Sequence, residues 1–146
     1  PAASLGLAYS PWFASDAVTV QDREVVRQLL EACGATDQVF EESQIDHFTA
    51  MTGPVPEFVA LFAQCMVDHA ERQGIDPQVA DRAVRQLFLA GGTMLAQDSA
   101  RPADHVRWMI DYAGTTAAGL NAMIDADISK TISDGLMAAA DRGKSL

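Results

Sequence analysis

The sequence has few positively charged residues. Its 146 residues include 10 lysines and arginines against 20 aspartates and glutamates, so the formal net charge is −10. Lysine and arginine supply most of the affinity of proteins for phosphate backbones. This charge balance therefore argues against a nucleic-acid partner. The acidic residues are spread along the chain, which is typical of solvated helix faces.

Cysteines, histidines and long apolar runs are also scarce. Cys33 and Cys65 form no CxxC pair, which favours buried thiols in a reducing compartment over a disulfide or a nucleophile. The three histidines share no ligand spacing, so we expect no metal site. No apolar run approaches about 20 residues, and no charged and apolar leader opens the chain. We therefore expect a cytoplasmic protein that does not bind a membrane.

Residues 1–42 differ from the rest of the chain in the spacing of their apolar residues. The short apolar segments SLGLAY and DQVFEE predict two strands. Between them, DREVVRQLLEACG has apolar residues at helical spacing, with Asp22 placed as the N-cap and Gly34 as the C-terminal stop. Two strands and one helix cannot bury both faces of a sheet, so this segment is expected to be the closing edge of a larger α/β sheet.

Residues 43–146 show helical periodicity throughout. The expected helices are residues 43–52, residues 57–73, a helix from the Asp76-Pro77 pair to about Gln97, one opened by Pro102, one opened by the GTT triplet, and residues 127–142. The fold class is therefore mainly α. Small residues are frequent and the apolar stripes are wide, so we expect closely packed helices and a second copy of the chain against them.

The stretch DYAGTTAAGL holds the most distinctive helix start. Gly114, Thr115 and Thr116 precede a run of small residues. One interpretation is an ordinary threonine N-cap. The other is a helix N-terminus whose free N–H groups bind an anion.

Three segments together resemble the dimerisation domain of the pyrroline-5-carboxylate reductase family. DHFTAMTGPVPEF is similar to the family's DAVTALSGSGPAY, and GIDPQVADRAV is similar to the Gly-to-Pro turn that starts the family's next helix. WMIDYAGTTAAGL is similar to VTSPGGTTIAGL. By this resemblance, residues 1–42 are the end of a Rossmann-like nucleotide-binding domain, and residues 43–146 are the helical dimerisation and substrate-side domain.

The resemblance implies an oxidoreductase that reduces a cyclic imine, 1-pyrroline-5-carboxylate or a related imino acid, with NADPH or NADH. No strand leading into a glycine-rich phosphate loop is present in the chain. NADP or NAD is therefore expected in the full-length protein and none on this chain alone, which should be inactive. The implied partner is a second copy of the chain, in a dimer or a higher oligomer. The alternative is a non-catalytic dimerisation module of a diverged reductase.

The resemblance also nominates residues for a substrate-binding site, without a certain catalytic residue. These are Gly114, Thr115, Thr116, Thr52 and Gly53. Glu57, at the start of the long helix, is either a carboxylate that interacts with the helix dipole or an acid on the substrate side.

The sequence departs from the family pattern beside both parts of this site. Asp111, Tyr112 and Ala113 stand where Ser, Pro and Gly usually precede GTT, and Pro54 and Val55 interrupt the GSG turn. Asp111 adds negative charge and Tyr112 adds bulk, so they are candidate substrate-side residues. These changes favour an imino substrate other than 1-pyrroline-5-carboxylate.

Overall fold

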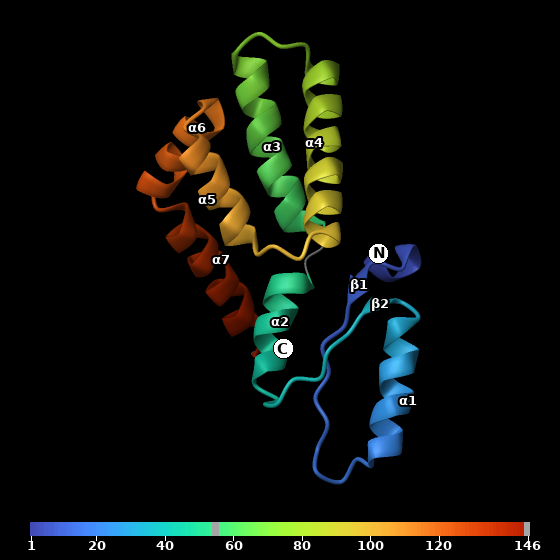
Figure 1. Cartoon of the computed structure of the whole chain (residues 1–146). Coiled ribbons are helices and arrows are strands. Elements are labelled where there is room, and N and C mark those ends of the chain that lie inside the picture. Colours follow the sequence, from blue (N-terminus) through green and yellow to red (C-terminus); the bar gives the residue numbers. More distant parts are fainter. Residues whose placement is uncertain (54–55, 145–146) are drawn as a thin grey trace. The chain divides into compact units, whose positions relative to one another are not determined.

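The structure is a computed structural model that describes residues 1–53 and 56–144. The chain forms two compact units, one of Pro1–Val55 with Ile132–Leu146 and one of Pro56–Thr131. The expected mainly α class is confirmed, because helices contain most of the described residues (Figure 1). The expected domain boundary after residue 42 stays a prediction.

The first unit contains two short parallel strands. β1 (Ala8–Tyr9) pairs with β2 (Gly34–Ala35), and a short 3-10 helix, η1 (Ala2–Leu5), precedes β1. The predicted strand over DQVFEE is wrong, because beyond β2 only an isolated bridge joins Trp12 and Gln38. The order of strand, helix and strand is as expected. The second strand, however, is Gly34–Ala35, which comes before DQVFEE in the chain.

The helix between the strands, α1 (Val20–Glu31), begins two residues before the expected cap. Thr19 is the N-cap and Asp22 is the third helical residue: the Asp22 N–H donates to the Thr19 hydroxyl at 3.2 Å, and the Thr19 N–H donates to the Asp22 carboxylate at 3.3 Å. Gly34 is also not the helix stop. It belongs to β2, where a Cβ atom would lie 2.1 Å from the Ala8 carbonyl oxygen.

The first unit also contains helical segments later in the chain. α2 (Gln44–Thr52) follows the β2 segment, and the C-terminal part of α7 (Ile128–Gly143) belongs to the same unit. The buried side chains of this unit are Val39, Ala50 and Ala140. The core is small, and large apolar side chains remain on the surface.

The second unit is built from helix pairs. α3 (Glu57–Arg72) packs along α4 (Pro77–Gln97), and Figure 1 shows the two side by side. Gly74, at φ 83°, reverses the chain between them. Asp76 is the N-cap of α4 and accepts hydrogen bonds from the N–H groups of Gln78 and Val79, at 2.9 and 3.1 Å. The expected start of this helix is confirmed.

The second pair is α5 (Pro102–Tyr112) and α6 (Thr115–Asp125), which also pack against each other (Figure 1). A two-residue link joins them, and Asp127, at φ 55°, comes directly before α7. The positions of the helices follow the sequence expectations closely. Pro102 and Thr115 are the first residues of their helices, as the Pro and GTT signals predicted.

The apolar stripes of α3 and α4 are not covered within the second unit. Its buried side chains are Ala80, Val84 and Ala117. Cys65, on α3, is exposed, so the prediction of a buried thiol is wrong at this position; Cys33 is half-buried, and both thiols are free. The physical reason is that the stripe carrying Cys65 has no covering element within the described part of the unit.

One segment, residues 44–72, could cross a membrane by its length and composition alone. This differs from the expectation that no segment reaches that length. It is weak evidence, because apolar helices of water-soluble proteins pass the same test. In the described residues, α2 ends at Thr52 and α3 begins at Glu57, and we assign no membrane role to them.

Candidate functional site

The N-terminus of α6 presents backbone N–H groups that no side chain caps. Gly114 is the N-cap, in an extended conformation, and offers no side-chain hydrogen bond. The Ala118 N–H donates to the Gly114 carbonyl at 3.3 Å. The N–H groups of Thr115, Thr116 and Ala117 therefore precede the first hydrogen bond of the helix. The interpretation of a threonine as the N-cap is wrong, because Thr115 and Thr116 are the first two helical residues.

The residues before Gly114 place an aromatic ring beside this helix start. Ala113 has a left-handed conformation, φ 57° and ψ 30°, and ends α5. A Cβ atom on Gly114 would lie 3.3 Å from Cδ1 and Cε1 of Tyr112, so the Tyr112 ring lies against the Gly114 backbone. The Tyr112 side chain is 80% exposed. Thus the ring is accessible to a ligand at the α6 N-terminus, and Asp111, also exposed, adds negative charge nearby in sequence.

Thr52 and Gly53 end α2 in the first unit. The Thr52 hydroxyl donates to the Phe48 carbonyl at 2.9 Å, so its hydrogen is already used within the helix. Gly53 continues the helical conformation, and its N–H donates to the Thr49 carbonyl at 3.1 Å. Pro54 and Val55 lie outside the described residues.

The expected site residues therefore fall into two groups. Gly114, Thr115 and Thr116 are in the second unit, as are Asp111 and Tyr112, whereas Thr52 and Gly53 are in the first. The residues of the first group lie close together because they are neighbours in the sequence. A shared role of the two groups in one site stays a prediction.

Glu57 is the first residue of α3. It is exposed, and the described residues give its carboxylate no hydrogen-bond partner. This position is favourable for a carboxylate because the helix dipole is positive there. The geometry fits the dipole interpretation, and a role on the substrate side stays a prediction.

Exposed apolar side chains are numerous on α3 and α4. On α3 these are Phe58, Val59, Leu61, Phe62 and Met66; on α4 they include Val79, Leu87, Met94 and Leu95. Exposed apolar side chains that gather on one surface often mark a contact with another protein.

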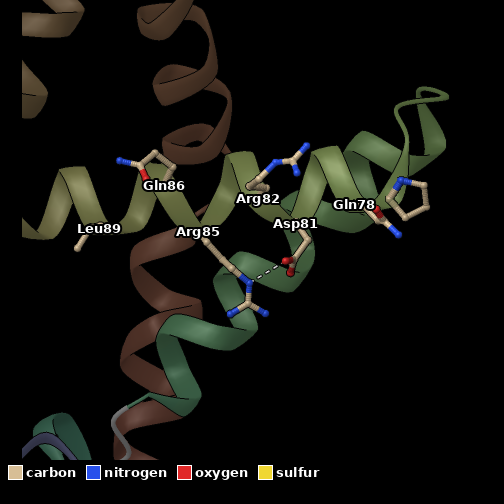
Figure 2. Close-up of a pocket in the computed structure, with 7 residues that line it drawn as sticks. Gln78, Asp81, Arg82, Arg85, Gln86 and Leu89 are labelled. Carbon is tan, nitrogen blue, oxygen red and sulfur yellow. Dashed lines mark hydrogen bonds and ion pairs between the residues drawn. The ribbon is translucent and has the colours of Figure 1, made fainter.

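The polar side of α4 forms a shallow hollow, drawn in Figure 2. Its lining residues all come from α4, and Arg85 points to Asp81, where the Nε and Oδ2 atoms are 2.8 Å apart. The hydrogen bond from Arg85 lowers the pKa of Asp81 and raises that of Arg85. No second element contributes to the lining, so this hollow lacks the convergent polar groups of a binding site.

A second cavity, in the first unit, was not predicted from the sequence. It brings together Tyr9, Asp37 and Phe48, which come from β1, the segment after β2, and α2. These residues are far apart in the chain, so no local spacing signals their contact. In the described part of the chain, no group of three histidine, cysteine or acidic side chains is arranged to hold a metal ion.

Residues 42–146 match the family model described as pyrroline-5-carboxylate reductase dimerisation. Among similar curated proteins, pyrroline-5-carboxylate reductase 3 of Rattus norvegicus is 31% identical over 126 residues, which cover 86% of this chain and 46% of the relative. Pyrroline-5-carboxylate reductase of Vibrio alginolyticus is 29% identical over 143 residues, which cover 97% of this chain and 53% of the relative. The chain thus spans about half the length of these relatives.

Solved structures support the same fold. A pyrroline-5-carboxylate reductase from Coxiella burnetii matches with a TM-score of 0.90 and 20% identity, over 99% of this chain and 54% of that one. The enzyme from Streptococcus pyogenes matches with a TM-score of 0.82 and 27% identity, over 99% of this chain and 56% of that one. The resemblance drawn from the three sequence segments is confirmed.

Proposed function

Because the chain belongs to the pyrroline-5-carboxylate reductase dimerisation family, we propose that it forms the dimerisation and substrate-side part of an NAD(P)H-dependent cyclic-imine reductase. Its curated relatives carry the name of this enzyme. A similar solved structure, from Plasmodium falciparum, is described with NADP bound. The substrate is 1-pyrroline-5-carboxylate, reduced to proline, or a related imino acid, and the location is cytoplasmic.

The observation that carries this proposal is the uncapped N-terminus of α6. The N–H groups of Thr115 and Thr116 and the positive end of the helix dipole suit a carboxylate. Holding that carboxylate would fix the imine carbon in one orientation, which lowers the entropic part of the barrier. The nicotinamide cofactor supplies the hydride, and we expect it to be held by residues of the full-length protein other than this chain.

The exposed faces of α3 and α4 support a second part of the proposal, a homodimer. Their apolar side chains have no cover within the second unit, and a second copy of the chain would bury them. Isologous contacts of this kind are the usual basis of homodimers. This chain alone would then dimerise without catalysing reduction.

Asp111 and Tyr112 support a related alternative. They lie directly before the α6 N-terminus, and the Tyr112 ring contacts Gly114, so the space for a ligand differs from that beside the Ser and Pro usual in the family. A different imino substrate, or a non-catalytic dimerisation module, would fit these changes. Glu57 remains a candidate for contact with the imine.

The decisive experiment is to measure NADPH and NADH oxidation by the full-length protein with 1-pyrroline-5-carboxylate. We expect imine-dependent oxidation. We also expect Thr115→Pro to raise the KM more than it lowers kcat, because proline removes one of the N–H groups proposed to bind the carboxylate and is tolerated as the first residue of a helix. The matched control is Val20→Pro, at the first residue of α1 in the other unit, which should leave the KM unchanged.

One outcome would contradict the proposal, and a second would decide between the substrates that it names. If the full-length protein bound no nicotinamide cofactor and oxidised none with any cyclic imine, the non-catalytic module would be the better account. If it turned over other cyclic imines but not 1-pyrroline-5-carboxylate, the class of enzyme would stand and the named substrate would be wrong.

A further inference from the structure

The cavity in the first unit has a volume of about 540 Å³, within the range of small-ligand sites. It lies between the segment after β2, helix α2 and the C-terminal part of α7, which are parts of one compact unit. Most of its surface is apolar. The apolar side chains from α2 and α7 are Phe48, Met51, Leu136 and Met137.

Aromatic side chains form one wall of this cavity. The ring centroids of Tyr9 and Phe48 are 5.8 Å apart with their planes tilted by 35°, so the two rings are neighbours in the lining. Phe40 lies at the rim and is 89% exposed. Its backbone N–H donates to the Gln44 side-chain oxygen at 3.3 Å, which ties the rim to α2.

A carboxylate stands at the edge of the aromatic wall. The Tyr9 hydroxyl donates to Oδ2 of Asp37 at 2.9 Å. This hydrogen bond raises the pKa of Tyr9, so the neutral phenol is favoured. A phenol that donates to an anion has an electron-rich ring, which strengthens its attraction for a cation.

The charges around the cavity have one predominant sign. Among the described residues that line it, none is a lysine or an arginine, and Asp37 supplies a full negative charge. Glu41 and Glu42 follow the rim residue in the sequence, within a chain of net charge −10. His47 is the one lining residue that can carry a positive charge.

We propose that this cavity binds a small organic cation with a methylated ammonium group. Cations are attracted to aromatic faces, and the carboxylate complements the charge. The methyl groups would contact the methionine and leucine side chains of the lining. An unmethylated ammonium would bring three N–H donors to a mainly apolar surface, where unpaired donors are costly.

The test is an NMR titration of the isotope-labelled chain with choline. The comparison ligand is 3,3-dimethylbutan-1-ol, which has the shape of choline without its charge. We expect saturable shifts of the Asp37, Phe48 and Leu136 amides, with choline bound about two- to fivefold more tightly than the alcohol. No shift at these amides, or equal affinity for both ligands, would overturn the proposal.

Two variants separate the charge from the aromatic wall. Asp37→Asn should remove most of the preference for choline over the alcohol, whereas Phe48→Leu should weaken choline binding. The matched control is Asp81→Asn, which removes the same charge from an exposed site in the other unit and should leave the affinity unchanged. If Asp37→Asn bound choline as tightly as the unaltered chain, the assignment of a cation site would be wrong.

Discussion

At the residue scale, the link between α5 and α6 departs from the family pattern in its side chains, and it contains one residue in a left-handed conformation. Ala113 adopts φ 57°, a conformation that glycine takes without cost. The resemblance places a glycine there. The alanine is therefore strained, and the strain lies directly before the proposed carboxylate site.

The strain at Ala113 can be tested by replacing it with glycine. Ala113→Gly should raise the free energy of unfolding by about 0.5–1 kcal/mol, because relief of the left-handed penalty exceeds the entropic cost of glycine. Urea denaturation measures the change. The control, Ala118→Gly in the interior of α6, should lower the free energy of unfolding by about 0.5–1 kcal/mol. Equal effects of the two changes would show that Ala113 carries no strain.

Tyr9 gives a second prediction at this scale. Its hydroxyl donates to Asp37, so its folded pKa lies above the ordinary value of 10.0. The contribution of this bond to stability is complete below about pH 10 and is lost as the pH rises through the folded pKa.

Ultraviolet absorbance of tyrosinate reports this titration. The difference between the titration curves of the unaltered chain and Tyr9→Phe isolates Tyr9, and its midpoint should lie above 10. In Asp37→Ala the midpoint should fall toward 10. A Tyr9 midpoint that does not respond to Asp37→Ala would refute the hydrogen bond.

At the scale of the helices and strands, local capping signals determine the helix starts. Asp76 followed by Pro77 begins α4, and the Asp76 carboxylate accepts two backbone hydrogen bonds. Asp76→Ala should lower the free energy of unfolding by about 1 kcal/mol. Thermal or urea denaturation would show it, with Asp81→Ala, which loses one exposed ion pair, as the control. The cap assignment fails if Asp81→Ala is the more destabilising change.

The sequence predicts features that depend on neighbouring residues better than features that depend on contacts between distant residues. The helices from α2 to α7 were predicted nearly to the residue, because Pro, Gly and apolar spacing act over a few positions. The second strand was misplaced, since its pairing depends on Ala8 contacting Gly34 across 26 residues. The α6 N-terminus was predicted from local residues, whereas the cavity at Tyr9 and Phe48 depends on tertiary contacts that no spacing reveals.

At the scale of the whole molecule, the exposed apolar side chains of α3 and α4 favour an assembly of two copies of the chain. We expect sedimentation equilibrium to give a dimer. Phe62→Lys should shift the chain toward monomer, because it places a charge in the proposed interface. The control, Gln64→Lys on the same helix, replaces a side chain that bonds Asp68 at 2.6 Å and should leave the dimer intact. A monomeric unaltered chain would contradict the homodimer.

Binding of a carboxylate at the N-terminus of α6 can be measured by NMR titration of the isotope-labelled chain with L-proline. We expect saturable chemical-shift changes at the amides of Thr115 and Thr116, and none with L-prolinamide, whose neutral amide replaces the carboxylate. Unchanged Thr115 and Thr116 amides, or equal changes with L-prolinamide, would contradict it.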